Sequence, residues 1–505
     1  MDNMEKDVKK LNILLLTNRD SDNIGDQVIE ANDIALLHAV MKNLQIPKHM
    51  YRINSRTAAI VTKKYMATRN AKYLETAEKE ISEADLVLFG GAPVFNYAYQ
   101  NFYERTAITL ELAQKYNKPV IFSAVGVESY DEESEKCQRL KAALNFDCVK
   151  QITTRDGFEN LQNYKENENL SIGLVSDPAV FSGDVFRSLI NKDKAKAEKK
   201  KIGIFVLRSN GFSDNEVDFS REDACELWVN LINELESRGY DCELLTSGHF
   251  GDEAFLDYLI RQYDLPQGKY VFNMNQPESL IKKMSEYDGI VSCRLHPSII
   301  SFAMNIPAVS LVWNVKVTGF YKGIGYPQRA IMREDFRADA IADRLEQAMA
   351  EGIQKDKEYL VSVYKALFTG IHDVFCPEDQ DMKAYSYDEL VEVIQPYKGT
   401  SQAEAQRKLT RKFRRVYDLC NRRLDQNTEL RKKAAELEEE TRQLKREVHQ
   451  LKKEVHQLKE KARSCESCER KEPVREKKFS AKKVVRRCLN SLRAVKPNSD
   501  NSKGK

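Results

Sequence analysis

Short apolar runs of strand length alternate with segments of helical periodicity over the first part of the chain. After the run at residues 11–17, apolar side chains recur at helical spacing from Val28 to Leu44. Further strands are expected at residues 84–89, 120–125, 149–154 and 174–175. Strands that alternate with helices pair in parallel, so the pattern predicts a doubly wound α/β sheet. In such a sheet, the residues that bind ligands are expected at the carboxyl ends of the strands.

The same alternation starts again after a charged run at residues 191–201, NKDKAKAEKKK. Strands are expected at residues 202–207, 242–245, 270–272 and 290–291, and a last one is opened by Pro307. We interpret the charged run as a linker between two Rossmann-like domains, residues 1–190 and 202–372. Two such halves with a cleft between them form the GT-B-like arrangement usual for glycosyl-type transferases. A connecting helix is expected within residues 373–401.

A heptad repeat dominates residues 402–463. Leucine takes the d positions and Thr or Val the a positions: Leu437, Leu444, Leu451 and Leu458 at d, and Thr441, Val448 and Val455 at a. This pattern favours a parallel two-stranded coil. The g and e positions are opposite in charge: Glu440, Glu447 and Glu454 at g, and Lys445, Lys452 and Lys459 at e. The repeat therefore predicts a dimer through a parallel coiled coil, and the alternative is a solitary charged helix.

Composition and charge narrow the class of protein. The chain has 505 residues, too many for one core, and two domains with an appendage is the natural expectation. Its 80 basic and 77 acidic residues give a net charge of +3, which excludes polyanion binding by the chain as a whole. Ten scattered cysteines are typical of reduced thiols. No signal peptide or membrane-spanning run is visible, so we expect a soluble cytoplasmic protein.

Residues 464–505 form a basic tail in which apolar side chains recur at helical spacing. Such a helix would lie on an anionic membrane surface, which would make the protein peripheral to the inner face of the membrane. The alternatives are disorder and nucleic-acid binding, of which disorder is the simpler, and no nucleic-acid partner is expected. Cys465 and Cys468 are only half of a zinc site.

The sequence SCRLHP carries the candidate residues Arg294, Leu295 and His296 between a buried strand and a helix. Pro297 is expected at the first position of that helix, where its missing N–H costs nothing. The carboxyl end of a strand at a helix N-terminus is a place for anions. An arginine fork beside an imidazole suits a substrate that carries a carboxylate or phosphate and needs a proton moved. In the alternative interpretation, the arginine pairs with a structural acid and the histidine caps the helix.

Loops after the first two strands hold further candidates. The first loop contains Asn23, Gly25 and Asp26, with Asp26 in the place of a helix N-cap. Gly25 lets the backbone approach a ligand closely, although a plain strand–turn–helix corner would look the same. The second loop begins at Gly90 and Gly91. Its aromatic residues suit either the core or stacking on a sugar, and Tyr97 is the better surface candidate.

Loops after other predicted strands contain two more basic candidates, an acidic candidate and a histidine. Arg208 follows the run at residues 202–207, and Lys316 lies in the glycine-containing loop NVKVTGFYKGIG. That loop could fold over a bound anion. Asp177 ends the run at residues 174–175, and His249 follows another strand without any sign of a partner.

With these residues in place, the chain resembles the polysaccharide pyruvyl transferase family. Seven motifs occur in the order the family shows: NIGD (23–26), LFGGA (88–92), AVGV (124–127), TTRD (153–156), SDP (176–178), SCRLHP (292–297) and NVKVTGF (314–320). The likeness extends from residue 11 to roughly residue 325. It differs at Ala92, where the family often has a third glycine, and at Glu128. Both lie in loops on the expected acceptor side.

The resemblance implies a GT-B-like fold and transfer of a pyruvyl group from phosphoenolpyruvate to a sugar, with a cyclic ketal and phosphate as products. It assigns the donor to Arg208, Arg294 and Leu295, with Lys316 as a third cation. His296 would act as acid or contact the phosphate, and Asp26 would act as base or orient the acceptor. The acceptor side would include the remaining candidates: Asn23, Gly25, Gly90, Gly91, Tyr97 and Asp177.

No cofactor is expected beyond phosphoenolpyruvate as donor substrate. No paired Cys/His spacing occurs in the two domains, so no metal requirement is predicted. The acceptor would be a glycan or a lipid-linked glycan. Two other functions remain open from the sequence. One is a nucleotide-sugar-dependent glycosyltransferase of the same fold, and the other is a non-catalytic scaffold that recruits partners through its coiled coil.

Overall fold

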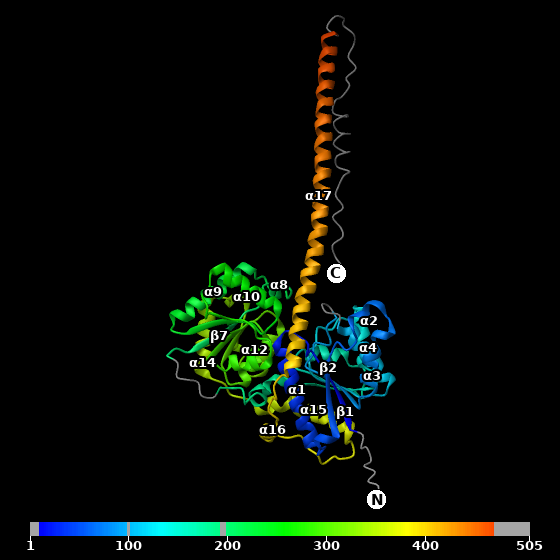
Figure 1. Cartoon of the computed structure of the whole chain (residues 1–505), viewed down its shortest axis with the longest axis vertical. Coiled ribbons are helices and arrows are strands. Elements are labelled where there is room, and N and C mark those ends of the chain that lie inside the picture. Colours follow the sequence, from blue (N-terminus) through cyan, green and yellow to red (C-terminus); the bar gives the residue numbers. More distant parts are fainter. Residues whose placement is uncertain (1–9, 98–101, 192–197, 469–505) are drawn as a thin grey trace. The chain divides into compact units, whose positions relative to one another are not determined.

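The computed structural model describes residues 10–97, 102–191 and 198–468, with side chains up to residue 464. The chain divides into two compact units, residues 1–417 and 418–505. The first unit contains two parallel sheets with helices around them, and the long helix α17 (Gln402–Cys468) runs from the first unit into the second (Figure 1). The two predicted α/β domains and a long C-terminal helix are therefore confirmed. Most of the predicted basic tail, residues 469–505, lies outside the described residues.

The first sheet has six parallel strands within the described residues, in the order β2-β1-β3-β4-β5-β6. The strands are β1 (Leu11–Thr17), β2 (Tyr51–Thr57), β3 (Leu86–Gly90), β4 (Val120–Val125), β5 (Val149–Thr154) and β6 (Ser171–Leu174). β1, β4 and β5 have the predicted bounds. β2 was not predicted, because only its first residue is buried and its other side chains, apart from Ile53, are polar.

The second sheet also has six parallel strands among the described residues, in the order β12-β11-β10-β7-β8-β9. They are β7 (Lys201–Phe205), β8 (Asp241–Leu245), β9 (Tyr270–Val271), β10 (Gly289–Ser292), β11 (Ala308–Leu311) and β12 (Ala330–Ile331). β7 begins at the last residue of the charged run, so Lys201 belongs to the sheet and not to a linker. The two-residue strand β12 is too short to leave a hydrophobic pattern in the sequence.

Helices connect the strands of each sheet. Those of the first half are α1 (Ile24–Asn43), α2 (Lys63–Thr68), α3 (Glu75–Ser82), α4 (Phe102–Lys115), α5 (Glu135–Leu144), α6 (Phe158–Tyr164) and α7 (Ser182–Val185). Those of the second half are α8 (Asn210–Ser213), α9 (Arg221–Ser237), α10 (Phe250–Tyr263), α11 (Pro277–Met284), α12 (Leu295–Ala303), α13 (Val315–Gly323) and α14 (Ala338–Glu351). The chain then continues through α15 (Lys357–Phe375) and α16 (Tyr387–Val393).

Helix α15 returns to the first sheet, although the sequence placed residues 202–372 in the second domain. It contacts β4 and β5, and the Gln151 side chain of β5 donates to the carbonyl oxygen of Ala366 at 3.0 Å. Gly370 allows this approach, because a Cβ there would lie 2.0 Å from Oε1 of Gln151. The helical periodicity of these residues predicts a helix but cannot show which sheet it covers.

One continuous apolar core joins the two sheets. It contains Val28 and Ile29 of α1 together with Ile299 and Ile300 of α12, all fully buried or nearly so. Burying each such side chain stabilises the fold by about 1.5–3 kcal/mol. α1 and α12 contact each other directly. This packing brings together the loops that precede the two helices.

Both helix starts differ from the prediction by a few residues. α12 begins at Leu295, so Pro297 is its third residue and not its first. Proline is still tolerated there because the first four N–H groups of a helix have no intrahelical partner. α1 begins at Ile24 with Asn23 as N-cap, and Asp26 lies inside the first turn. The prediction that Asp26 is the N-cap was therefore wrong.

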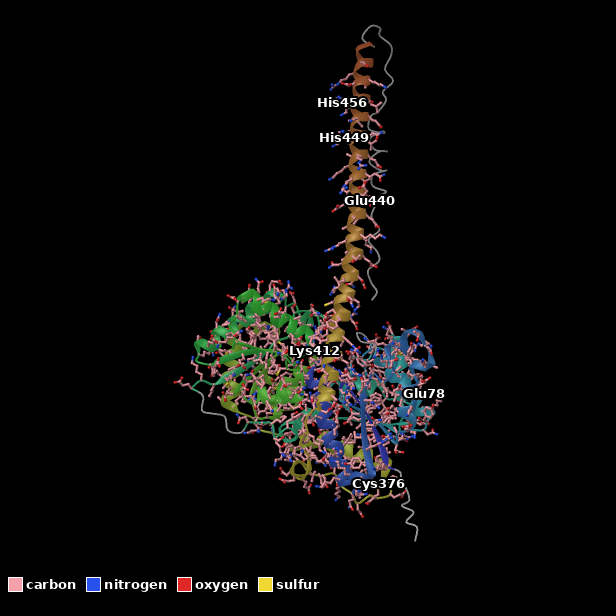
Figure 2. All side chains as sticks on the ribbon, in the orientation of Figure 1. Glu78, Cys376, Lys412, Glu440, His449 and His456 are labelled. Atoms are coloured by element: carbon pink, nitrogen blue, oxygen red, sulfur yellow. The ribbon has the colours of Figure 1, made fainter. Side chains whose placement is uncertain are left out.

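The second unit contains the rest of α17. The heptad leucines at the predicted d positions are exposed, from 53% for Leu444 to 64% for Leu458. Glu440, His449 and His456 also point outward from this helix (Figure 2). A single chain therefore leaves the heptad seam unburied, and pairing with a second helix stays a prediction. Of the helices described, none is both long enough and apolar enough to cross a bilayer.

Candidate functional site

The predicted site residues follow strands at which the order of each sheet reverses. In the first sheet, β1 and β3 are neighbours, although β2 separates them in sequence, and in the second sheet β7 and β10 are neighbours. Loops diverge at such switch points and leave a crevice where ligands bind. Asn23, Gly25 and Asp26 follow β1, Gly90 ends β3, Arg208 follows β7, and Arg294, Leu295 and His296 follow β10.

The first turns of α1 and α12 are in contact. Gly25 is the second residue of α1 and His296 the second residue of α12. A Cβ on Gly25 would lie 2.4 Å from Cβ, Cγ and Nδ1 of His296, so the imidazole packs directly on the glycine backbone. Two helix N-termini therefore lie side by side, and their unpaired N–H groups favour an anion.

The Gly25→Ala variant is expected to lower the free energy of unfolding by about 1–3 kcal/mol, because the new methyl group must displace the His296 ring. Gly319→Ala is the matched control, since Gly319 lies inside α13 and has nothing within 4 Å of a Cβ. That variant should be neutral or more stable by up to about 1 kcal/mol. Urea unfolding of both variants checks the prediction, and equal effects would contradict it.

Arg294 is held by a buried carboxylate. Its Nε donates to Oδ2 of Asp252 at 2.8 Å and its Nη2 donates to Oδ1 at 2.8 Å. The Asp252 side chain has no exposed surface, and the guanidinium lies 5.9 Å from the ring centroid of Trp313. Nη1 of Arg294 makes no hydrogen bond to any residue that the structure describes. One edge of the fork is therefore fixed by a structural acid, and Nη1 is left for a ligand.

Arg208 and His249 lie around the same carboxylate. Nη1 of Arg208 is 3.6 Å from Oδ1 of Asp252, and Nδ1 of His249 is 3.8 Å from it. Nδ1 of His249 also accepts the N–H of Gly251, so it caps α10. Burial, together with the charges of Arg294 and Arg208, lowers the pKa of His249 to about 4, although Asp252 and Asp22 oppose this shift. His249 is therefore part of the Arg208–Arg294 cluster and is not the incidental residue that the sequence suggested.

His296 is buried, and its Nε2 has no hydrogen-bond partner among the described residues. Burial lowers its pKa to about 4. Asp26 opposes this shift, whereas Arg155, Arg294 and Lys316 add to it. The imidazole is thus neutral at pH 7. An unpartnered ring nitrogen in a buried place is costly unless a ligand uses it.

Lys316 of α13 faces residues from the first sheet. Its Nζ lies 4.0 Å from Oδ2 of Asp156, which follows β5. A Cβ on Gly126 would lie only 3.2 Å from the same Nζ. Nearby, burial raises the pKa of Glu128, while Lys316 and a hydrogen bond from Asn96 oppose the rise. The lysine therefore reaches from the second sheet to strand ends of the first.

A model of the polysaccharide pyruvyl transferase family matches residues 9–315, which include both switch points and the residues around His296. The chain belongs to this family. It is accordingly a transferase, and the match ends one residue before Lys316. A comparison with curated protein sequences gave no match.

Several solved structures resemble this family member at low sequence identity. The UDP-GlcNAc 2-epimerase of Methanocaldococcus jannaschii is 13% identical, with 72% of this chain and 99% of that chain covered and a TM-score of 0.44. A putative UDP-N-acetylglucosamine 2-epimerase of Listeria monocytogenes is 12% identical, with 75% and 99% covered and a TM-score of 0.48. A glycosyltransferase of Rickettsia africae ESF-5 is 15% identical, with 76% and 96% covered and a TM-score of 0.42.

The residues assigned to the acceptor side of this pyruvyl transferase mostly bond to other parts of the chain. Asn23 accepts a hydrogen bond from Oγ of Ser247 at 2.9 Å, and Asp177 pairs with Arg155 at 2.5 Å and caps a short 3-10 helix. The hydroxyl of Tyr97 donates to the carbonyl oxygen of Ser129 at 2.7 Å. These three side chains hold loops in place, and their contact with a sugar stays a prediction.

The glycine pair after β3 makes room for α1. A Cβ on Gly90 would lie 2.3 Å from Oδ2 of Asp33, and Gly91 has φ +54°, with Ile29 of α1 against it. Burial raises the pKa of Asp33 well above its usual value, and the Asp177 charge raises it further, whereas Arg155 opposes the rise. The glycines are therefore needed for packing as well as for any ligand.

Sequence reasoning about this pyruvyl transferase missed three functional candidates: Asp252, Arg155 and Trp313. Asp252 lies in the first turn of α10, where an acid is common for helix-dipole reasons alone. Arg155 follows β5 directly inside the TTRD motif, and its place after a strand was the one available signal. Asp26 accepts a hydrogen bond from Asn18 at 2.9 Å and lies close enough to shift the pKa of His296. Among the described residues, no group of three or more His, Cys, Asp or Glu could hold a metal ion.

Proposed function

We propose that this chain transfers a pyruvyl group from phosphoenolpyruvate to a sugar of a cell-surface polysaccharide or its lipid-linked precursor, with a pyruvate ketal and phosphate as products. The family match supports pyruvyl transfer to a polysaccharide. The donor and the ketal chemistry rest on the geometry of the cations and of His296.

One observation supports the donor most directly. Nη1 of Arg294 and the buried Nε2 of His296 both lack a partner among the described residues, and they are separated by one residue at a helix N-terminus. Phosphoenolpyruvate has a carboxylate and a phosphate on neighbouring atoms. Arg294 and Arg208 can pair with these two groups, and Lys316 can close over the phosphate from α13.

The reaction requires two hydroxyl groups of the sugar. The methylene carbon of the donor gains a proton, one sugar oxygen bonds to the central carbon, and a second sugar oxygen then displaces the phosphate from that carbon. Of the two hydroxyl protons, one balances the proton on the new methyl group and the other leaves with the phosphate. No oxidant or reductant is consumed.

His296 and Asp26 are the groups we assign to these proton movements. His296 is neutral before the donor binds, and a phosphate beside its ring would raise its pKa and let it hold the proton. It would then act as acid toward the methylene carbon or as donor of a hydrogen bond to the phosphate. Asp26 lies in the same first turn as Gly25 and would take a sugar proton or orient the hydroxyl.

The test is release of inorganic phosphate from phosphoenolpyruvate by the full chain against a panel of sugar acceptors, with mass spectrometry of the product. The proposal expects a product that is heavier by one pyruvyl group and contains a ketal. Calorimetry with UDP and with phosphoenolpyruvate separates the alternative. Binding of UDP without any phosphate release would favour a nucleotide-sugar-dependent glycosyltransferase.

We further propose that two chains associate through the heptad seam of α17. The exposed leucines at d and the opposite charges at g and e support a second copy as the partner. Light scattering at micromolar concentration should give twice the mass of one chain. Leu444→Asp with Leu451→Asp should give one chain mass, because each change places a charge in the seam.

The control for the dimer is His449→Asp with His456→Asp, which puts the same charges on the outer face of the same heptads. This variant should remain a dimer. A wild-type chain that scatters as a monomer would overturn the proposal. Contact of the basic tail with anionic lipid and a cytoplasmic location remain predictions from the sequence.

A further inference from the structure

The first turns of α17, residues 402–417, are strongly basic and lie beyond the residues that match the family. They contain six basic residues and one acid: Arg407, Lys408, Arg411, Lys412, Arg414 and Arg415, with Glu404. The family match ends at residue 315. This segment belongs to the same compact unit as the two sheets. The family model therefore does not describe the contacts that residues 402–417 make with the two domains.

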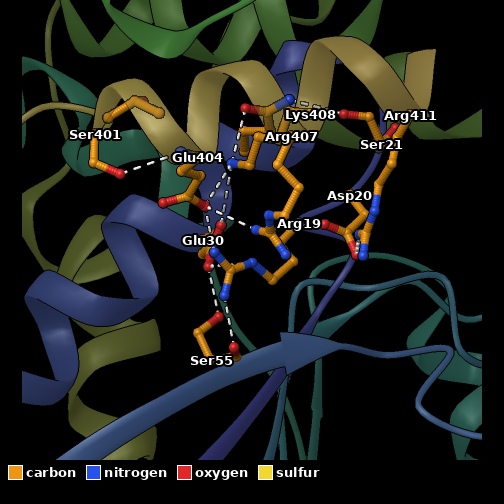
Figure 3. Close-up of polar contacts among 12 residues, drawn as sticks. Arg19, Asp20, Ser21, Glu30, Ser55, Ser401, Glu404, Arg407, Lys408 and Arg411 are labelled. Atoms are coloured by element: carbon orange, nitrogen blue, oxygen red, sulfur yellow. Dashed lines mark hydrogen bonds and ion pairs between the residues drawn. The ribbon is translucent and has the colours of Figure 1, made fainter. Parts of the chain in front are cut away.

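One side of the segment contacts the loop after β1 and the start of α1 (Figure 3). Arg19 pairs with Glu404 and, at 3.2 Å, with Glu30 of α1. Lys408 donates to Oε1 of Gln27 at 3.1 Å, and Arg411 pairs with Asp20. All of these partners belong to the first domain.

The next turn contacts the second domain. Nζ of Lys412 lies 2.6 Å from Oε2 of Glu253 in α10 and 2.8 Å from Oδ1 of Asn275. The Lys412 and Glu253 side chains are only 12% and 19% exposed, so solvent and salt screen this pair weakly. The same segment of α17 therefore bonds to both domains.

Arg415 contacts the place where the two domains meet. Its Nη1 lies 3.2 Å from Oδ1 of Asp22, and its Nη2 donates to the carbonyl oxygen of Asp20 at 2.6 Å. The other oxygen of Asp22 accepts the N–H of Phe250, the first residue of α10, at 3.2 Å. Asp22 is thus shared between α17 and the start of a helix in the second domain.

Backbone hydrogen bonds between the domains lie next to this contact. The N–H of Ile24 donates to the carbonyl oxygen of Ser247 at 2.8 Å. A Cβ on Gly248 would lie 2.8 Å from the carbonyl oxygen of Asp22, so the two loops touch. Two residues after Phe250, Asp252 holds Arg294. The order of contacts runs from Arg415 through Asp22 and the start of α10 to Arg294.

We propose that Lys412 and Arg415 are positioning residues for the donor site: they hold the loop after β1 against the start of α10 and so keep the start of α1, with Gly25 and Asp26, in register with Arg294 and His296. This inference rests on the proposed function for its kinetic consequence. The two residues touch neither the substrate nor the reacting atoms. They set the fraction of molecules in which the two domains are closed around the site.

The kinetic signature follows from this role. If the contacts are lost, fewer free molecules have a closed site, and the apparent affinity for donor falls by that fraction. Saturating donor restores the closed arrangement. We therefore expect Lys412→Met with Arg415→Met to raise KM for phosphoenolpyruvate by about tenfold while kcat changes by less than about twofold.

Arg414→Met is the matched control. Arg414 is exposed on the same turn and makes no side-chain hydrogen bond or ion pair with any described residue. Its removal takes away one positive charge from the segment, as each substitution of the double variant does. Its KM and kcat should equal those of the unchanged chain. Arg415→Lys should retain part of the effect of Arg415, because a lysine can still pair with Asp22.

Hydrogen exchange of the full chain tests the same inference without turnover. The N–H groups of Ile24 and Phe250 bond across the domains, so peptides that contain them should exchange faster in the double variant and unchanged in Arg414→Met. Unchanged exchange in the double variant would overturn the inference. So would a loss of kcat without a change in KM, or an equal effect of Arg414→Met.

The two proposals fail in different ways. If the unchanged chain releases no phosphate with any acceptor, the proposed function fails, while the exchange result still decides whether Lys412 and Arg415 hold the domains together. If phosphate is released and the double variant behaves as the unchanged chain in both measurements, only the positioning role fails.

Discussion

Arg294→Lys is expected to lower kcat/KM for phosphoenolpyruvate by about a hundredfold, with most of the loss in donor affinity. Arg294 donates twice to Asp252 and presents Nη1 to the ligand. A lysine has one nitrogen, which cannot pair with the buried carboxylate and with the donor in the same geometry. Lysine is the better test than methionine, since removal of the charge would leave the buried Asp252 without its two-bonded partner, at a cost of up to about 3–5 kcal/mol.

The control for Arg294→Lys is Arg329→Lys. Arg329 is also buried, pairs with Glu351 at 3.4 Å and lies over the ring of Tyr326. Steady-state kinetics and thermal unfolding of both variants check the prediction. Arg329→Lys should lower stability and leave kcat/KM unchanged. Equal kinetic losses in the two variants would show that any buried arginine matters and that Arg294 does not bind the donor.

His296→Gln is expected to lower kcat by about a thousandfold, which is within the usual effect of a general acid or base. Glutamine keeps a polar side chain but cannot take up a proton. His38→Gln is the matched control, because burial also lowers the pKa of His38 to about 4 and its ring bonds to Tyr51 at 2.7 Å, with no contact to the site. Initial rates at saturating donor decide the result, and a loss of less than tenfold would exclude His296 from the proton transfer.

The same variant should change how stability depends on pH. Burial lowers the pKa of His296 from 6.5 to about 4, so between these values the unfolded chain binds a proton that the folded chain does not. The stability that the neutral, buried His296 contributes is fully present above pH 6.5 and is lost as the pH falls toward 4. Over that range, His296→Gln should remove up to about 3 kcal/mol of pH dependence from the free energy of unfolding. Urea unfolding at pH 4.5 and 7 measures it, and an unchanged slope would show that the imidazole is not buried.

Donor binding tests whether His296 can act as the acid. Calorimetry of phosphoenolpyruvate at pH 6, in buffers with different ionisation enthalpies, reports the protons taken up on binding. Uptake that is absent in His296→Gln would show that the bound donor protonates His296, which the acid role requires. Equal proton uptake in both proteins would assign it as a contact of the phosphate.

Strand positions could be predicted from the sequence, but their order in the sheets could not. The predicted strands gave β1, β4 and β5 to the residue: β1 and β4 are short, buried and mainly apolar, as parallel strands usually are, whereas β5 also contains polar residues such as Lys150 and Gln151. Nothing local shows that β7 and β10 are neighbours, and it is this pairing that places Arg208 beside Arg294. The family resemblance supplied that relation, and the hydrophobic pattern did not.

The site was predictable where a residue acts at its own strand end and not where it acts through a distant partner. Arg294 and His296 could be proposed from one strand–helix junction. Asp252 lies 42 residues before Arg294 in sequence, and only the fold shows that it holds the guanidinium. The contact of Gly25 with His296 likewise depends on how α1 packs against α12. The bonds of Tyr97 and Asp177 within their own loops could not be told from sugar contacts.

The return of the chain to the first sheet limits how relatives of this enzyme can be recombined. Tyr364 of α15 accepts a hydrogen bond from Asn43 of α1 at 2.8 Å, and the N–H of Tyr397 donates to Val185 at 2.8 Å. A chimera that exchanges domains at the charged run near residue 200 would separate these partners. It would also expose the face of the first domain that α15 covers. Swapping acceptor preference between homologues should therefore require two crossover points, with residues 357–397 inherited from the same parent as residues 10–190.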